Sequence, residues 1–302
     1  MQAFSGHQAS YLNQIEAYVA RMPSLSTTAT KVLETCNNPQ SSPNDLNRLI
    51  ALDPVLAGQV LRLINSAYYS LSHPVSSLTR AIIMLGINTV KNLVLSFAIL
   101  QQLPMAKPFG TLSPVSFWEH CVAVGVVAKW LAEFKGVQLA DQEDYFVGGL
   151  LHDLGKIPLN HQFPDEARQA MALTGQQHWS AVQAESVIFG FDHSMVGGLI
   201  ARKWRLSRAY VDVLTYHHRP ADAAENTLQL VFTVALADLY ARLLEQDSDD
   251  DTLANDEFAA LVMARVGLDA FTLAQARDTV LAEIDRAKIF LEISQRKPGH
   301  DR

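Results

Sequence analysis

The sequence has few cysteines and little excess positive charge. Among its 302 residues only Cys36 and Cys121 are cysteines, and they lie far apart in apolar segments. Such a pair does not make a disulfide framework, so we expect a reducing cytoplasm. The 24 lysine and arginine residues are outnumbered by 31 aspartates and glutamates, which gives a net charge of −7. No global basic field would recruit nucleic acid, and we expect no nucleic-acid partner.

Long hydrophobic runs and a secretion signal are also missing from the chain. No apolar stretch reaches the roughly 18 uninterrupted residues that a membrane span needs. The first twenty residues lack a basic region followed by an apolar core, so no signal peptide is expected. Hydrophobic residues make up 49% of the chain and charged residues 18%, which is typical of a packed globular protein. We therefore expect a soluble cytoplasmic protein with no membrane partner.

Alternating strand patterns are scarce, whereas apolar residues recur at spacings of three and four throughout the chain. Ser42-Pro43 and Asp53-Pro54 each place a capping oxygen before a proline, as at helix starts. Gly86, Gly136 and Gly190 stand where helices should end. The fold class predicted is all-α. The helices are expected at 11–21, 26–36, 43–51, 54–66, 77–85, 89–102, 115–135, 142–154, 165–174, 180–189, 193–204, 207–217, 227–245, 255–265 and 272–295.

One segment, "QQLPMAKPFGTLSP" (101–114), concentrates three prolines and a glycine and is the best domain-boundary signal in the chain. A chain of this length more naturally forms two domains than one. We predict a smaller N-terminal helical bundle over 1–108 and a larger helical domain over 109–302. A C-terminal helical extension is expected from about residue 250, after the acidic run "EQDSDDD" (245–251).

Several histidines and aspartates lie in segments that are otherwise apolar. A single buried histidine is more often a core residue than a metal ligand, but here the set is large. An unpaired carboxylate in an apolar helix would cost several kcal/mol. Imidazole and carboxylate groups brought together around a divalent Zn, Fe, Mn or Ni ion would satisfy one another. The candidate ligands are His120, His152, Asp153, His193, His217, His218 and Asp238.

His152 and Asp153 are adjacent, in the stretch "GGLLHDLGKIPLNHQ" (148–162). Neighbouring residues at a helix end diverge by about 100°, so they can hold one cation from two sides or bridge two cations. Gly155 is predicted to end the helix, so that Lys156 turns back toward the site. A cation at a helix C-terminus is the alternative explanation for Lys156.

The order of these residues resembles that of the HD superfamily of metal-dependent phosphohydrolases, an all-α group with metal ligands in the order H…HD…D. His120, the His152-Asp153 pair and Asp238 match that order. The string "HDLGK" is similar to the HDxGK motif of the HD-GYP branch, which degrades cyclic dinucleotides. His193, His217 and His218 fall where that branch has ligands for a second metal. The resemblance implies an HD-like helical domain holding one or two divalent ions.

The N-terminal half is similar to the HDOD domain, the HD-related output domain of bacterial signalling. The resemblance rests on "LDPVLAGQVLRLINSA" and the "SSLTRAIIMLG" segment that follows, and it runs from about Met22 to about Leu244. The chain departs from the HD-GYP enzymes at two points. Arg219 stands where a glutamate follows their paired histidines, with no Gly-Tyr-Pro motif after it, and Ser116 stands where some have a further metal-binding glutamate.

Two functions follow from the resemblance for a bacterial cytoplasmic signalling protein. The first is metal-dependent hydrolysis of a phosphorylated small molecule or nucleotide, with Asp153 bridging the metals and orienting the nucleophile. Lys156 would stabilise negative charge on the phosphoryl group. The second is an output module without turnover. Its metal site would be structural or ligand-sensing, and its N-terminal bundle would dock a protein partner.

Overall fold

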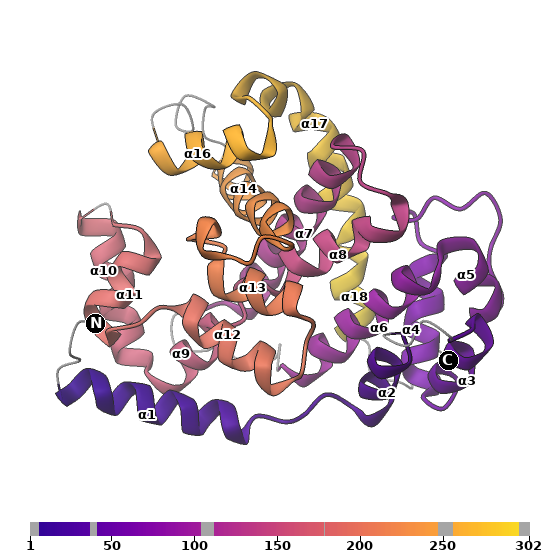
Figure 1. Cartoon of the computed structure of the whole chain (residues 1–302), viewed down its shortest axis with the longest axis horizontal. Helices are drawn as coiled ribbons and strands as arrows, with labels where there is room; N and C mark the ends of the chain where they lie inside the picture. The colour runs from indigo at the N-terminus through magenta and orange to yellow at the C-terminus, as the bar shows by residue number, and fades with distance from the viewer. Residues whose placement is uncertain (1–5, 37–40, 104–111, 178, 247–255, 296–302) are drawn as a thin grey trace.

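The computed structural model describes residues 6–36, 41–103, 112–177, 179–246 and 256–295 (Figure 1). Within these ranges every regular element is a helix, and Leu112 alone forms an isolated bridge. The all-α prediction is confirmed. Most of the boundary segment 101–114 and of the acidic run 245–251 lies outside the described residues.

In the described part of the chain, the N-terminal half is a group of five helices, two of which begin at the predicted caps. Ser42 accepts a hydrogen bond from the Asp45 backbone N–H, and Asp53 accepts one from Leu56 at 3.0 Å. Gly86 adopts a φ of 88° between two helices, a conformation that favours glycine. The helices of this group are α2 (Thr27–Cys36), α3 (Pro43–Ile50), α4 (Pro54–Ile64), α5 (Leu78–Leu85) and α6 (Ile87–Gln102).

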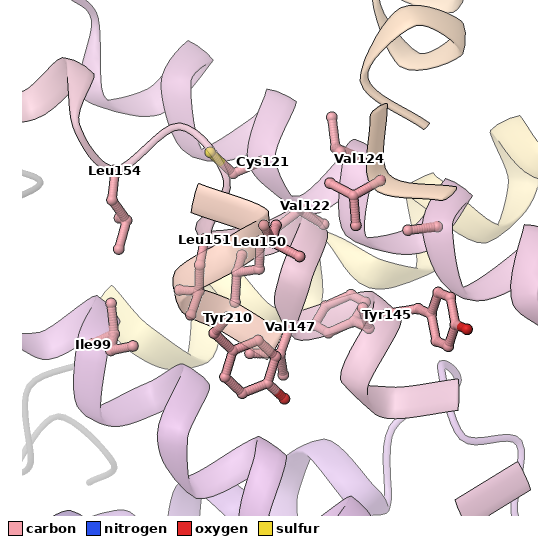
Figure 2. Close-up of a cluster of buried hydrophobic side chains, with 14 of the residues drawn as sticks. Ile99, Cys121, Val122, Val124, Tyr145, Val147, Leu150, Leu151, Leu154 and Tyr210 are labelled. Atoms are coloured by element: carbon pink, nitrogen blue, oxygen red, sulfur yellow. The ribbon is translucent and has the colours of Figure 1, made fainter. Parts of the chain in front are cut away.

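The C-terminal half is built around a long buried helix, α7 (Pro114–Phe134), which packs along α8 (Leu139–Leu151) and α14 (Leu228–Glu245). Figure 2 shows part of the core where α6, α7, α8 and α13 meet, including Cys121, Leu150 and Tyr210. Both cysteines are free thiols. The other helices of this half are α9 (Lys156–Gln162), α10 (Pro164–Gln177), α11 (Ala181–Phe189), α12 (His193–Lys203), α13 (Arg208–Tyr216), the 3₁₀ turn η1 (Pro220–Asp222), α16 (Glu257–Val266), α17 (Ala270–Ala287) and α18 (Ile289–Gln295).

The first and last described helices each pack against the half of the protein at the other end of the chain. Helix α1 (Gly6–Arg21) packs against α9, α11 and α12 of the C-terminal half. Helix α18 packs against α4 and α6 of the N-terminal half and also contacts α7. The two halves are therefore held together at both ends of the chain, and the division near residue 108 stays a prediction.

The largest differences from the predicted helices are at three places. The helix expected over 142–154 is α8, which ends at Leu151, and a further helix, α9, begins at Lys156. The last helix, expected over 272–295, is two helices that break at Lys288. The first helix begins at Gly6, five residues before the predicted start. Periodicity locates a helix well but its ends poorly, because the terminal turns depend on tertiary contacts.

Helix α7 is long and apolar enough, by length and composition, to pass as a membrane span. In its 18-residue apolar window 67% of the residues are buried inside the protein, as in a core helix. The helices α5 and α6 pass the same test only as a pair, and they are bent by 119° at Gly86.

Candidate metal centre

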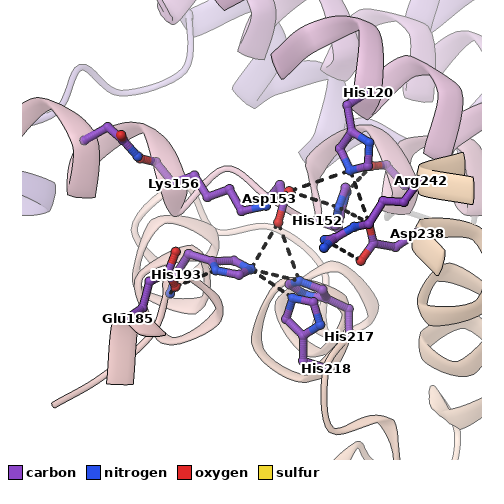
Figure 3. A network of polar contacts seen from close by, with 12 residues as sticks. His120, His152, Asp153, Lys156, Glu185, His193, His217, His218, Asp238 and Arg242 are labelled. Atoms are coloured by element: carbon purple, nitrogen blue, oxygen red, sulfur yellow. Dashed lines mark hydrogen bonds and ion pairs between the residues drawn. The ribbon is translucent and has the colours of Figure 1, made fainter. Parts of the chain in front are cut away.

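The structure brings all seven predicted ligands into one buried network (Figure 3). They come from five places in the C-terminal half. Helix α7 carries His120, the turn after α8 carries His152 and Asp153, and α12 begins with His193; His217 and His218 follow α13, and α14 carries Asp238. His152, Asp153 and His193 are fully buried. The grouping that the sequence predicted is present, although metal binding itself stays a prediction.

The turn at His152–Gly155 is packed directly onto helix α12. A Cβ atom on Gly155 would lie 1.9 Å from the carbonyl oxygen of His193 and 2.6 Å from the backbone nitrogen of Gly197. The sequence suggested that Gly155 ends a helix. That interpretation is wrong, because the φ of Gly155 is −63°, which is ordinary helical backbone. Gly155 is required because only glycine lets the two backbones approach this closely, and that approach places Asp153 beside His193.

The first donor set consists of Asp153, His193, His217 and His218, whose ligand atoms all lie within 4.8 Å of one another. The Nε2 atom of His193 is 3.1 Å from Oδ1 of Asp153 and 3.0 Å from Nε2 of His218. It is also 3.4 Å from Nε2 of His217. Three imidazole nitrogens and one carboxylate oxygen thus converge, which is a ligand set suited to a divalent transition metal.

The second donor set consists of His120, His152 and Asp238, again within 4.8 Å. Oδ1 of Asp238 lies 3.1 Å from Nε2 of His120 and 3.5 Å from Nε2 of His152. Asp153 connects the two sets because its other oxygen, Oδ2, lies 3.3 Å from Nε2 of His152. Asp153 therefore lies between the two donor sets, and its bridging of two metals stays a prediction.

Four of the histidines direct Nε2 into the centre because their Nδ1 atoms are held elsewhere. Nδ1 of His152 lies 2.7 Å from the carbonyl oxygen of Gly149, and Nδ1 of His217 lies 3.0 Å from that of Val213. A ring whose Nδ1–H donates to a carbonyl presents Nε2 as a lone pair in its neutral form. The backbone of α8 and α13 thus orients two of the rings for a metal.

The other two histidines are oriented by carboxylates that the sequence analysis missed. Glu185 lies 2.6 Å from Nδ1 of His193, and Glu245 lies 2.9 Å from Nδ1 of His120. Carboxylates behind metal-binding histidines are a recurrent feature of metal sites. Spacing gave no signal for Glu185. Glu245 is the last residue of α14, as predicted, but its contact with His120 was not foreseen.

Two buried polar atoms at the centre have no hydrogen-bond partner among the described residues. They are Oδ1 of Asp153 and Nε2 of His152. Buried polar atoms in native proteins nearly always have a hydrogen-bond partner, and the atoms nearest to these two belong to other candidate ligands. A cation within the two donor sets would satisfy both atoms. The residues present therefore fit a divalent metal ion.

Two side-chain cations also reach the centre. Lys156 forms a short ion pair with Oδ2 of Asp153, as expected from its predicted turn back toward the site. It is the first residue of α9, where the helix dipole disfavours a cation, so the alternative explanation of a helix C-terminus is wrong. Arg242 binds both oxygens of Asp238, at 2.9 and 2.8 Å. Arg242 was missed, although its i,i+4 spacing from Asp238 on a helix was a usable signal.

The carboxylates raise the pKa of some histidines and burial lowers that of others. Burial alone would lower the pKa of His152, but Asp153 and Asp238 outweigh it and raise the pKa to about 9. Burial is likewise outweighed at His193, where Glu185 and Asp153 raise the pKa to about 9. Burial lowers the pKa of His217 to about 4. The centre thus mixes rings that hold a second proton with rings that stay neutral.

A cavity of about 200 Å³ opens beside the centre, between α9, α10 and α11. Its lining includes Lys156 and Glu185, both of which contact predicted ligands. The rest of its wall is mainly apolar, with Ala170, Met171 and Phe189 among the lining residues. A larger cavity of about 610 Å³, between α7 and α17, contains none of the seven ligands.

The two departures noted in the sequence leave the centre without further ligands at those positions. Ser116 is exposed on α7, and its backbone N–H is capped by Ser113. Arg219 is exposed just before η1. Neither residue belongs to the donor sets.

Known proteins support the fold and the family. A curated relative, an uncharacterized protein of Treponema pallidum (strain Nichols), is 23% identical over 230 residues, which is 75% of this chain but 43% of that protein. The chain therefore spans less than half the length of that relative. A crystal structure of an HDOD domain protein of unknown function from Geobacter sulfurreducens has a TM-score of 0.75 and 27% identity, over 93% of this chain and 97% of the other.

A second solved structure, from Shewanella amazonensis SB2B, is named a candidate phosphohydrolase. It has a TM-score of 0.70 and 24% identity, and the match covers 94% of this chain and 99% of that chain. At this identity the likeness shows the fold alone. The family model described as the HDOD domain matches residues 22–220, about two thirds of the sequence. The chain belongs to the HDOD domain family.

Proposed function

We propose that this protein is a metal-dependent phosphohydrolase that acts on a phosphorylated small molecule or nucleotide. The observation that carries the proposal is the convergence of Oδ1 of Asp153 with three imidazole nitrogens in a mostly buried site. A solved structure that shares this fold is named a candidate phosphohydrolase, which is compatible with the proposal. A divalent ion bound there would supply a water of lowered pKa and would polarise a phosphate oxygen.

The residues around the donor sets have separate roles in this proposal. Asp153 holds the ion and orients the attacking nucleophile. Lys156, whose side chain is 17% exposed, offsets negative charge that develops on the phosphoryl group. Glu185 keeps the ring of His193 in place, because it accepts hydrogen bonds from both the backbone N–H and the ring. Each of these roles depends on a charge or a hydrogen bond at a side-chain atom that the folded chain already holds in place.

The cavity beside Lys156 favours a small organic group on the substrate. About 200 Å³ is less than most ligand pockets enclose, and the wall is largely apolar. Asn160 and Thr174 add polar groups to the lining. A phosphomonoester with a compact apolar substituent fits this lining better than a cyclic dinucleotide does, and the missing Gly-Tyr-Pro motif agrees with that preference.

A second candidate function is that of a cytoplasmic signalling module whose metal site is structural or ligand-sensing. The burial of His152, Asp153 and His193 favours it, because a substrate must reach the reacting atoms. In this case the N-terminal bundle docks a protein partner. Both functions need a bound metal ion, but only the phosphohydrolase turns over a substrate.

Elemental analysis and a hydrolysis screen test both candidates. The purified full chain is compared with the variant His152→Ala/Asp153→Ala for bound Zn, Fe, Mn and Ni. Equal metal content in the two proteins would refute the ligand assignment. The metal-loaded protein is then assayed with nitrophenyl phosphate, bis-nitrophenyl phosphate and cyclic dinucleotides. Turnover that the double variant lacks supports the phosphohydrolase, and a metal-loaded protein inert to all of them favours the signalling module.

A further inference from the structure

The two donor sets differ in how their carboxylate oxygens are held. On the side of His193, Oδ1 of Asp153 has no hydrogen-bond partner among the described residues. On the side of His152, Oδ2 of the same carboxylate is paired with Lys156. Asp238, the carboxylate of the second donor set, is paired with Arg242. One set therefore offers a carboxylate oxygen that faces only imidazole rings, whereas the other offers only oxygens that face a lysine or an arginine.

The Arg242–Asp238 pair occupies both oxygens of its carboxylate. Nε of Arg242 lies 2.9 Å from Oδ1, and Nη2 lies 2.8 Å from Oδ2. The Asp238 side chain is 4% exposed and that of Arg242 is 34% exposed, so the pair is partly shielded from water. Two parallel hydrogen bonds between a guanidinium and a carboxylate are among the strongest side-chain contacts. A metal ion at Asp238 would have to approach a fixed positive charge.

The charges around the centre leave room for one divalent ion. Four carboxylates surround the histidines, and two side-chain cations contact them, so these six groups sum to two negative charges. One divalent ion balances these charges. A second ion would leave two uncompensated positive charges in a mostly buried site, which is costly. The carboxylates are Asp153, Glu185, Asp238 and Glu245, and the cations are Lys156 and Arg242.

We propose that the centre is loaded with one divalent ion, held by Asp153, His193, His217 and His218. Lys156 and Arg242 stand in for a second ion beside His120, His152 and Asp238. This inference rests on the proposed metal centre, and it assigns to each donor set a different occupant. It also makes Arg242 a determinant of metal number, because removal of its charge frees both oxygens of Asp238.

Titration of the metal-free chain with Mn²⁺ tests the number of ions. Free Mn²⁺ is followed by electron paramagnetic resonance, and bound metal is counted by elemental analysis after dialysis. The wild type is expected to bind one Mn²⁺ per chain, and Arg242→Gln is expected to bind two. The matched control is Arg286→Gln, which removes an arginine from an exposed ion pair with Glu283 on α17 and should leave one ion bound.

A charge-preserving variant distinguishes the effect of the positive charge of Arg242 from an effect on folding. Arg242→Lys keeps the positive charge and is expected to retain one ion, although lysine cannot reproduce the two parallel hydrogen bonds. Circular dichroism confirms that each variant is folded before it is titrated. Two ions in the wild type, or one ion in a folded Arg242→Gln, would overturn the inference and leave the proposed function standing. No bound ion in the wild type would overturn both.

The position of the single ion is tested independently of Arg242. His218→Ala removes a ligand of the first set, and His120→Ala removes a ligand of the second set. We expect His218→Ala to weaken Mn²⁺ binding by at least tenfold and His120→Ala to leave one ion bound with affinity within about threefold of the wild type. The reverse pattern would place the ion in the second set and refute the assignment.

Discussion

Oε2 of Glu185 lies 2.6 Å from Nδ1 of His193 and 2.8 Å from the backbone nitrogen of the same residue. One carboxylate oxygen on α11 thus fixes both the first residue of α12 and the direction of its ring. Asp192, the N-cap of α12, accepts a hydrogen bond from Met195 at 3.0 Å and holds the helix start in place. His193 is consequently among the most constrained groups of the centre.

We expect Glu185→Gln to weaken metal binding by about 10- to 100-fold, because the amide orients the ring but no longer supplies the negative charge behind it. Titration with Mn²⁺ measures the change. Glu34→Gln, on the exposed face of α2, is the control and should bind as the wild type does. Unchanged affinity in Glu185→Gln would show that the carboxylate does not support the metal site.

Metal affinity should rise with pH from 6.5 to about 9. The pKa of His193, which burial lowers and Glu185 and Asp153 raise, is about 9, so its ring holds a second proton at neutral pH. A metal binds the neutral ring and must displace that proton, so affinity gains about tenfold per pH unit until the pKa is passed. Burial keeps the pKa of His217 at about 4, and His217 therefore contributes no further slope in this range.

Isothermal titration at several pH values, in buffers of different ionisation enthalpy, measures both the affinity and the number of protons released. About one proton should be released per ion at pH 7.5. A pH-independent affinity over this range would contradict the assignment of His193 as a ligand.

Chelation should destabilise the protein. An ion that binds only the folded chain at a thousand times its dissociation constant stabilises it by about 4 kcal/mol. For a chain of this length that corresponds to a Tm lower by about 6 °C after removal of the metal. Differential scanning calorimetry with and without EDTA gives the shift, and Asp153→Ala should show none. An equal effect of EDTA on both proteins would place the stabilising ion elsewhere.

Gly155→Ala should both destabilise the protein and weaken metal binding. The added Cβ would meet the backbone of α12, and the atoms within 3 Å belong to main chain that cannot move aside cheaply. We expect a loss of about 3 kcal/mol in the free energy of unfolding and a weaker affinity for Mn²⁺. Denaturant unfolding and Mn²⁺ titration measure the two effects.

The control for this substitution is Gly175→Ala on α10, where a Cβ meets nothing within 4 Å. That change should stabilise the helix by about 0.5–1 kcal/mol, since alanine is the better helix former. If Gly155→Ala were as harmless as Gly175→Ala, the close packing of the turn on α12 would not be needed for the site.

Filling the cavity beside Lys156 should narrow the substrate range. Met171 lines the cavity and is 55% exposed, so Met171→Trp can add bulk at the rim without overpacking the core. We expect kcat/KM to fall about tenfold or more for nitrophenyl phosphate and less for a smaller alkyl phosphate, with metal content unchanged. Met84→Trp, on the exposed face of α5, is the control. Equal losses for both substrates would argue against the cavity as a substrate pocket.

Local sequence patterns predicted most of the helices of the fold. The caps at Ser42 and Asp53 and the glycine at position 86 act over three or four residues, so their structural consequences could be read from neighbours in the chain. The break at Lys288 and the short helix α9 could not, because each depends on what packs against it. The same limit explains why Gly155 was interpreted as a helix end: the atoms that require glycine there belong to His193 and Gly197.

Helical periodicity and residue order were enough to predict the all-α architecture, the family and the seven polar residues that their apolar segments cannot bury alone. The division of those residues into two sets, and the carboxylates behind their rings, came from the folded structure. Glu245 reaches His120 across 125 positions, and Asp238 reaches it across 118. Pairings at such separations follow from the packing of α7 against α14, and helical periodicity specifies which face is buried but not which partner it meets.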